Sequence, residues 1–488
     1  MTVRILTASL ILALAAAPAT PQGLPDLGDA SAAALSDQQE RTIGNRIMRE
    51  VRVDPAYLDD PQVADYIASM GARLLGAADG PRRDIDYFVV KDDSINAFAL
   101  VGGHIGVNSA LVMLTQNESE LAGVLAHETA HILQRHQARM MHGQRGAQWS
   151  SLAALALAII ASRGSGSQSG QVTEAAVAAA GALQIQSQID YTREHEREAD
   201  RVGLTLLERS GYDPRGMQTF FERLLRANRL NEFKGAPAYL RTHPLTTERI
   251  AEMQDRLDRS PPRMVPDSFE YRLARARLRA ANGSANEAVT LFQTMLADQT
   301  VLRPRDDVYG LALALRRARD FDAAWKTLAP LRIGSSHPAF ELLAGELKSD
   351  MRREDESLAI YRAALKTSPH YRALTYAYLD LLLQTGKGRE VLADLDERLR
   401  NVQDDARLYE LQARAFEASG QGLAQHRAQA EAYVRRGNLA AAVDQLEIAV
   451  KQTRGADFYA LSSAESRLRE LRSLLENERT AEKALKIS

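Results

Sequence analysis

The sequence predicts an α+β fold that is mostly α: a domain of helices around a small β-sheet, followed by an all-α solenoid of stacked helix pairs. β-forming residues are concentrated in residues 85–108, whereas the chain from residue 267 onward has a helical pattern throughout. Three prolines lie within residues 261–266, and proline cannot continue a helix. We therefore expect a first domain over 20–260, this linker, and a second domain over 267–488.

Composition excludes several classes of protein. The chain has 488 residues, a formal net charge of -2 and no cysteine. The near-neutral charge gives no support to nucleic-acid binding, which usually requires a basic excess. Without cysteine, the chain has neither a disulfide scaffold nor a thiol nucleophile.

Residues 1–19 have the layout of a secretory signal peptide. Arg4 precedes an apolar run over 5–17, which ends in Ala-Pro-Ala, a small-residue cleavage site. This run is too short to cross a bilayer, which takes about 20 residues. We expect export and no transmembrane anchor, with an uncleaved N-terminal anchor as the alternative. A second apolar run, 152–161, predicts a core or lid helix, and the Ser/Gly tract 162–171 predicts a mobile loop.

Capping signals predict two helices before the strands. Ser36 can accept hydrogen bonds at the start of a helix over 36–51. Pro61 suits the first turn of a helix over 61–75, where its missing amide hydrogen is not needed. Residues 95–108 then predict two short strands around a tight Gly-Gly turn.

The second domain contains a helical segment that recurs about every 34 residues. The third positions of four aligned segments are residues 288, 324, 357 and 391, and three of them are Ala or Ser. Helix pairs of this length resemble tetratricopeptide repeats, which stack because one pair cannot bury its own apolar face. We expect a binding scaffold rather than a catalytic unit, with a generic helical bundle as the alternative.

The motif that carries chemistry is His-Glu-x-x-His at residues 127–131. On a helix, His127 and His131 share one face, so both imidazoles can reach one Zn²⁺ ion. Glu128 lies beside them, where it can take a proton from zinc-bound water. We predict one zinc ion per chain; two surface histidines on a helix are the alternative.

A catalytic zinc site needs a third protein ligand. Glu196 and Asp200 fall on a helical stripe that is otherwise small and apolar, and this stripe should face inward. A buried carboxylate is costly unless it is paired or binds a metal. We predict Glu196 as the ligand and Asp200 as the acceptor of a hydrogen bond from a ligand histidine. His195 is the main rival ligand, although it lies off the stripe, and Glu198 falls on the predicted solvated face.

These motifs resemble a known family. The pairing of 127–131 with Glu-x-x-x-Asp-x-x-Gly at 196–203 is similar to the gluzincin peptidases that include the HtpX heat-shock protease and the CAAX prenyl endopeptidase. Residues 102–108 and Thr-His-Pro at 242–244 add to the likeness. The resemblance covers nearly the whole chain and points to periplasmic members with C-terminal tetratricopeptide repeats. It implies a zincin-type metallopeptidase domain.

By this resemblance, His127, His131 and Glu196 are the zinc ligands and Glu128 is the general base. His243 matches the family's regulatory histidine, which can occupy the open metal position and keep the enzyme shut. From the residues alone, a surface position in a turn is favoured for His243, and a place at the edge of a lid is the alternative. His136 and His142 are expected on a helix surface or at its end.

The resemblance also implies the cellular role. It indicates a periplasmic zinc endopeptidase that cleaves misfolded or stalled outer-membrane proteins, with the repeats contacting the outer-membrane barrel-assembly machinery. A chaperone or assembly adaptor with a mostly shut site is the alternative, and a secreted digestive or virulence protease is a third. Zinc peptidases generally hold an extended substrate beside an edge strand. The candidates for this strand, which could also be an ordinary hairpin, are Asn96, Ala97, Phe98, Gly102 and Gly103.

Overall fold

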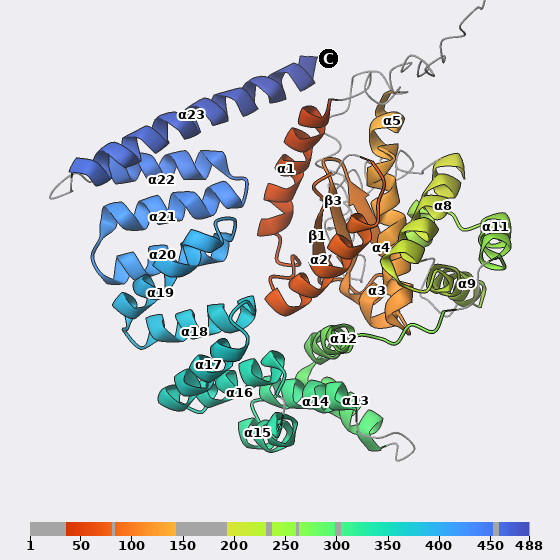
Figure 1. The fold of residues 1–488 in the computed structure, drawn as a ribbon, viewed down its shortest axis with the longest axis horizontal. Helices are drawn as coiled ribbons and strands as arrows, with labels where there is room; N and C mark the ends of the chain where they lie inside the picture. The colour runs from red at the N-terminus through yellow and green to blue at the C-terminus, as the bar shows by residue number, and fades with distance from the viewer. Residues whose placement is uncertain are drawn as a thin grey trace, which may run out of the picture.

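The computed structural model describes residues 36–80, 83–142, 193–230, 237–259, 263–297, 304–334, 336–451 and 458–487. Helices around a three-stranded sheet form its N-terminal part, and a curved array of helices follows (Figure 1). The predicted signal peptide, the run at 152–161, the tract at 162–171 and the first two linker prolines lie outside the described residues.

The two expected N-terminal helices are confirmed. Helix α1 (Asp37–Val53) begins with a reciprocal capping box, in which the side chains of Ser36 and Gln39 each accept from the other's backbone amide. Helix α2 (Pro61–Gly76) begins with proline in its first turn, and the carboxylate of Asp60 caps it.

The expected hairpin is also present, within a three-stranded sheet. Strand β3 (His104–Asn108) lies in the centre, antiparallel to β2 (Ala97–Leu100) and parallel to β1 (Asp86–Val90). Gly102 and Gly103 make the turn with φ of 87° and 89°, which is the left-handed region that favours glycine. Strand β2 is therefore one of the two edges of the sheet.

Alternating side chains of the strands enter two separate cores, as the pleat of a sheet requires. Phe88 and Phe98 pack with the apolar face of α1, whose members include Ile47. Ile105 and Val107 point to the opposite face and join the larger core, which includes residues of α2 and α4.

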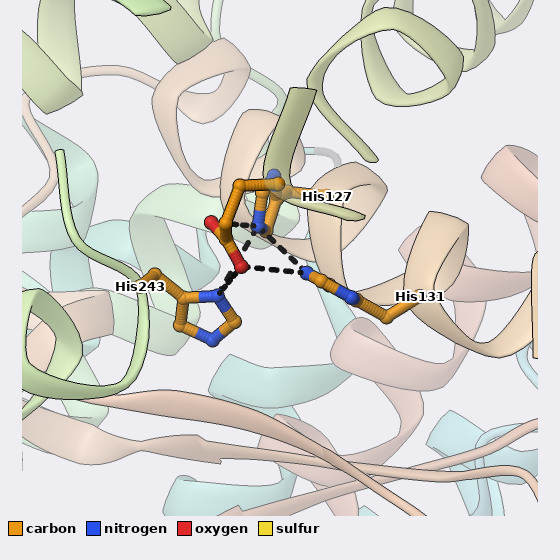
Figure 2. Close-up of side chains that lie close together, drawn as sticks. His127, His131 and His243 are labelled. Atoms are coloured by element: carbon orange, nitrogen blue, oxygen red, sulfur yellow. Dashed lines mark hydrogen bonds and ion pairs between the residues drawn. The ribbon is translucent and has the colours of Figure 1, made fainter. Parts of the chain in front are cut away.

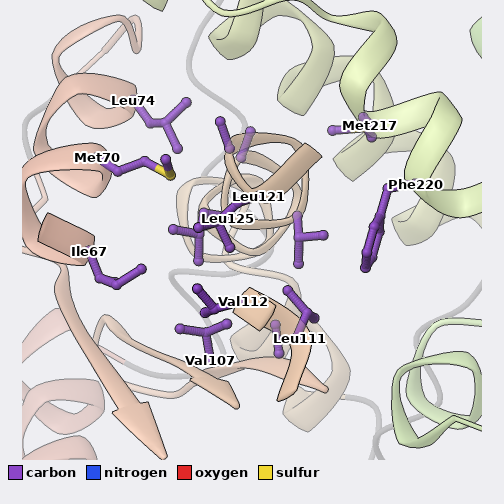
Figure 3. Packing of buried hydrophobic residues seen from close by; sticks show 14 of the residues in the cluster. Ile67, Met70, Leu74, Val107, Leu111, Val112, Leu121, Leu125, Met217 and Phe220 are labelled. Carbon is purple, nitrogen blue, oxygen red and sulfur yellow. The ribbon is translucent and has the colours of Figure 1, made fainter. Parts of the chain in front are cut away.

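Helix α4 (Glu118–Leu133) runs through the middle of this larger core. On one side it packs against α2, and on the other against α9 (Arg215–Arg229), as the leucines of α4 show in Figure 3. Helix α8 (Arg193–Ser210) crosses α4 so closely that a Cβ on Gly203 would lie 3.2 Å from the amide nitrogen of His127. The tight packing fixes the position of the motif that α4 carries. The other helices of this part are α3 (Ser109–Leu114), α5 (His136–His142), α10 (Ala238–Thr242) and α11 (Thr247–Leu257).

A curved array of helices makes up the rest of the described chain (Figure 1). The four aligned third positions, residues 288, 324, 357 and 391, are all buried, which the expected packing between helices requires. The array consists of α12 (Phe269–Ala281), α13 (Ala285–Ala297), α14 (Arg305–Arg317), α15 (Phe321–Leu328), the 3₁₀ helix η1 (Ala329–Arg332), α16 (Pro338–Asp350), α17 (Glu354–Thr367), α18 (Arg372–Gln384), α19 (Gly388–Asn401), α20 (Ala406–Ala418), α21 (Gly422–Arg435), α22 (Leu439–Lys451) and α23 (Phe458–Ile487).

The array curves back onto the N-terminal part at both of its ends. Helix α2 contacts α12 and α18, and the side chain of Gln62 on α2 accepts hydrogen bonds from the hydroxyls of Tyr309 and Tyr371 at 3.3 and 2.9 Å. At the far end, α23 contacts α1 through an ion pair between Arg49 and Glu478. Across the ranges that the structure describes, no helix combines the length and the apolar character needed to cross a membrane.

Candidate metal centre

Four side chains that could bind a metal ion converge at the C-terminal half of α4. His127 and His131 belong to α4, and Glu196 belongs to the first turn of α8. His243 directly follows the last residue of α10. All four are buried, and one nitrogen or oxygen of each lies within 4.8 Å of the others. Figure 2 shows the three imidazoles pointing toward one another. The structure therefore brings together the three predicted ligands and the predicted regulatory histidine.

The distances between these atoms fit a tetrahedral ion. Nε2 of His127 lies 3.0 Å from Nε2 of His131, 3.3 Å from Nδ1 of His243 and 3.5 Å from Oε2 of Glu196. Oε1 of Glu196 lies 3.4 Å from Nε2 of His131 and 3.0 Å from Nδ1 of His243. Ligands at bond lengths of 2.0–2.1 Å around tetrahedral zinc are about 3.3 Å apart. The donor set and its spacing are thus those of a site that could hold a metal ion.

The charges of the ligands depend strongly on one another. Burial lowers the pKa of His127, but the carboxylates of Asp200 and Glu196 outweigh it and raise that pKa to about 9. Burial, with the positive charges of His127 and His243, holds the pKa of His131 well below its usual value. Burial opposes ionisation of Glu196, yet the three histidines hold its pKa well below the usual range. A metal ion that binds here therefore meets an ionised Glu196 and a neutral His131, and it must displace a proton from His127.

Asp200 lies where the sequence predicts it, behind a ligand histidine. Its Oδ1 is 3.0 Å from Nδ1 of His127, on the side of the ring away from the other ligands. The same carboxylate accepts two hydrogen bonds of 2.7 Å from Arg249 on α11. A further nitrogen of Arg249 lies 2.7 Å from Oε2 of Glu196. Arg249 is a site residue that sequence reasoning missed.

The carboxylate of Glu128 faces the site and makes no strong polar contact with the described residues. Its side chain is fully buried, and neither carboxylate oxygen has a hydrogen-bond partner among the described residues. Nε2 of His243 lies 3.4 Å from Oε1 of Glu128. A buried carboxylate left open in this way is available to accept a proton from a group that enters the site.

His243 closes the site from the α10 side. Its side chain is 1% exposed, so it is not a surface turn residue. Its ring stacks on that of Tyr239, with centroids 4.7 Å apart, and its amide donates to the carbonyl of Tyr239. These contacts within α10 hold the imidazole among the other ligands.

The predicted substrate strand lies on an edge of the sheet that other groups partly cover. Asn96, Ala97 and Phe98 are buried, and Ala97 and Phe98 belong to the edge strand β2. The amide of Tyr239 donates to the carbonyl of Ile95, just before β2, at 3.1 Å. Gln137 of α5 donates to the carbonyl of Ala99. Both carbonyls face away from β3, so α5 and α10 occupy positions that an added strand would use.

His136 lies at the end of a helix, one of its two expected positions, because it is the first residue of α5. It does not lie on a helix surface: Arg135, whose φ of 52° is left-handed, separates α4 from α5, and the ring of His136 is fully buried beside His131. The rival ligand His195 is not in the ligand cluster; it stacks on His136 with ring centroids 4.5 Å apart. Glu198 is only partly solvated, since it accepts a hydrogen bond from Arg139 at 2.8 Å. The side chain of His142 lies outside the described residues.

Comparisons with known proteins agree with this geometry. Residues 61–257 match peptidase family M48. The chain is 33% identical over 460 residues to the Beta-barrel assembly-enhancing protease of Escherichia coli, and the match covers 92% of each chain. It is 37% identical over 318 residues to the Putative beta-barrel assembly-enhancing protease of Vibrio cholerae, covering 64% of this chain and 63% of that one. It is also 29% identical over 231 residues to the Metalloprotease YcaL of Escherichia coli, covering 46% and 83%. The chain therefore belongs to peptidase family M48 and is a metalloendopeptidase similar over most of its length to the beta-barrel assembly-enhancing proteases.

Proposed function

We propose that this protein is a zinc-dependent endopeptidase of the periplasm that acts in the assembly of outer-membrane proteins and cleaves misfolded or stalled ones. One observation carries the chemistry: His127, His131 and Glu196 meet at zinc spacing beside Glu128, a buried carboxylate with no hydrogen-bond partner among the described residues. The names of the relatives, which span 92% of the chain at 33% identity, support the role in barrel assembly.

Each residue of the site has a separate role in the proposed reaction. A zinc ion bound by His127, His131 and Glu196 would polarise the scissile carbonyl and make water more acidic. Glu128 takes the proton of the attacking water and delivers it to the leaving amine nitrogen. The carboxylate of Asp200, 3.0 Å from Nδ1 of His127, favours a hydrogen on that nitrogen, which keeps Nε2 of the ring free to bind the metal. Each of these roles follows from the position of one side chain.

The substrate chain enters along the edge of β2, in this proposal. Asn96 and the first residues of β2, Ala97 and Phe98, with the turn at Gly102 and Gly103, would present main-chain groups to an extended peptide. Burial of this edge by α10 means that the peptide must displace Tyr239 from the carbonyl of Ile95. An unfolded segment, which has free backbone groups, fits such an edge better than a folded domain does.

His243 would act as a removable fourth ligand. Its Nδ1 lies in the ligand cluster, in the position that a catalytic zinc site keeps open for water and substrate. Loss of the imidazole in His243→Ala should open that position and raise the rate of proteolysis. We would compare cleavage of unfolded casein by the parent and by His243→Ala, with His337→Ala as a control at a histidine in the helical array. A rate for His243→Ala no higher than that of the parent would contradict this role.

The helical array would supply the docking surface. We propose domain boundaries at 20–260 for the peptidase and 267–488 for tetratricopeptide repeats, joined by the linker 261–266 and preceded by a signal peptide over 1–19. The burial of the four aligned small or apolar positions supports a repeat architecture. In this proposal the array contacts the barrel-assembly machinery of the outer membrane and brings substrate to the peptidase.

A second function is favoured by the closed arrangement of the site. With His243 among the ligands and α10 on the edge of β2, the protein could serve mainly as an assembly adaptor or chaperone. Cells that carry only Glu128→Gln distinguish the two functions. Normal outer-membrane assembly in such cells would favour the adaptor, whereas accumulation of stalled outer-membrane proteins would favour the protease.

A further inference from the structure

We propose that His136 and Glu198 form a hydrogen-bonded relay that orients His131 for metal binding, so that both are positioning residues of the site. This inference rests on the proposed function, because it takes His131 to be a metal ligand. It assigns a role to a buried histidine and a carboxylate that the mechanism above does not use.

The relay is continuous from the ligand to the protein surface. Nδ1 of His136 lies 2.8 Å from Nδ1 of His131, and Nε2 of His136 lies 3.1 Å from Oε2 of Glu198. Arg139 donates to the same oxygen of Glu198 at 2.8 Å. The His136 side chain is fully buried, whereas that of Glu198 is 25% exposed. The carboxylate thus forms the solvent-side end of the chain of contacts.

The carboxylate decides where the protons lie. A carboxylate only accepts hydrogen bonds, so Nε2 of His136 must donate to Glu198, and Nδ1 of a neutral His136 ring is then an acceptor. That acceptor requires Nδ1 of His131 to be the donor. Nε2 of His131 is left with its lone pair, and it is the nitrogen that faces His127 and Glu196. The relay therefore selects the tautomer of His131 that can bind a metal at the cluster.

The opposite tautomers of His136 and His131 are unfavourable at both ends of the relay. They would place two acceptors, Nε2 of His136 and the carboxylate of Glu198, 3.1 Å apart. They would also put a hydrogen on Nε2 of His131, where it would point at the ligand position. A ligand histidine held by a second group in this way is a recurrent feature of metal sites.

Helix α8 supports the two ligand histidines separately. Asp200 lies 3.0 Å from Nδ1 of His127, and Glu198, through His136, performs the same service for His131. Glu196, on the same helix, is the proposed ligand, so α8 provides one ligand carboxylate and two carboxylates that support ligand histidines. The left-handed residue Arg135 makes the second support possible, because it breaks the helix between α4 and α5, and His136 then contacts His131.

Zinc affinity of the full mature chain tests the relay. His136→Leu keeps volume but removes the acceptor, whereas His136→Asn can place its amide oxygen near the position of Nδ1. We expect His136→Leu to weaken zinc affinity about 10–100-fold in a chelator competition, and His136→Asn to stay within about threefold of the parent. His195→Leu, which removes the ring stacked on His136, is the matched control and should also stay within about threefold. Loss of the Co²⁺ absorption bands in His136→Leu and their recovery in His136→Asn should accompany these affinities.

The zinc affinities distinguish failure of the relay from failure of the proposed function. A parent chain that binds no zinc would refute the metal site itself. A parent that binds zinc, with His136→Leu equal to it in affinity, would refute the relay alone. If circular dichroism shows that His136→Leu is not folded, the zinc affinities of Glu198→Ala and Glu198→Gln are compared instead. Substitutions of Glu198 are better tolerated because its side chain is partly exposed. The relay then requires weaker zinc binding in Glu198→Ala than in Glu198→Gln, and equal affinities would overturn it.

Discussion

Arg249 donates two hydrogen bonds of 2.7 Å to the carboxylate of Asp200, and both side chains are buried. The same guanidinium lies 2.7 Å from Glu196 and donates to the carbonyl of Pro244, the residue after His243. Arg249 thus connects the two buried carboxylates of α8 to the segment that carries the predicted regulatory histidine. Its pKa is raised because the carboxylates outweigh the effect of burial.

Replacing Arg249 should destabilise the protein more than replacing an exposed arginine of the same helix. Arg249→Met leaves two buried carboxylates without their cation, which costs about 3–5 kcal/mol when a buried pair is broken. Arg256→Met, at an exposed position of α11, should cost less than about 0.5 kcal/mol. Urea unfolding of the metal-free proteins measures both. Equal midpoints for the two variants would show that the Arg249 contacts contribute no stability.

Removal of the metal should lower the unfolding temperature. A ligand that binds only the folded chain, at 1,000 times its dissociation constant, adds about 4.1 kcal/mol. We expect a chelator to lower Tm of the parent and added Zn²⁺ to restore it. In Glu196→Ala the response to zinc should be reduced or lost, and a full response there would argue against Glu196 as a ligand.

The stability that Asp86 provides should disappear in acid. Burial raises the pKa of Asp86, but His104, whose Nδ1 lies 3.4 Å from the carboxylate, and the charge of Arg52 outweigh it, and the pKa is lowered overall. A carboxylate with a lowered folded-state pKa stabilises the fold above its unfolded value near 4 and loses that effect as the pH falls through the folded value. Asp86→Asn should therefore be less stable than the parent at pH 6, with a difference that shrinks toward pH 3.5. A difference that is constant across this range would contradict the ion-pair explanation.

The contact between α2 and the helical array should depend on Gln62. Gln62→Leu removes the acceptor of the Tyr309 and Tyr371 hydroxyls, and leaving a buried hydroxyl unpaired costs about 1–3 kcal/mol. We expect a lower Tm and faster cleavage near the linker by an added protease. Gln38→Leu, at an exposed position of α1, is the control. Equal proteolysis of the two variants would mean that these hydrogen bonds do not hold the array in place.

Local patterns predicted much of the fold and the site. The caps of α1 and α2, the Gly-Gly hairpin and the positions of His127 and His131 depend on residues close in sequence. The helical stripe was sufficient to select Glu196 over His195, because the side chains of one helix face follow from its period.

Features that depend on a break in a helix or on distant elements could not be predicted. His136 follows a left-handed arginine that separates α4 from α5, and no period of 3.6 residues extends across such a break. Arg249 reaches Asp200 from a separate helix, so its role is visible only after α8 and α11 have packed. The contact between α23 and α1 joins residues 429 positions apart, and neither Arg49 nor Glu478 carries a motif.

The most direct test of the account compares His243→Ala with His243→Ala/Glu128→Gln in the cleavage of unfolded casein, each chain loaded with zinc. The His243→Ala background removes the side chain that occupies the ligand cluster, so that a closed site does not mask the result. We predict equal zinc content and a rate about 10²–10⁴-fold lower in the double variant, since Glu128 moves the proton. Cleavage at the same rate by both proteins, or by neither although both bind zinc, would contradict it.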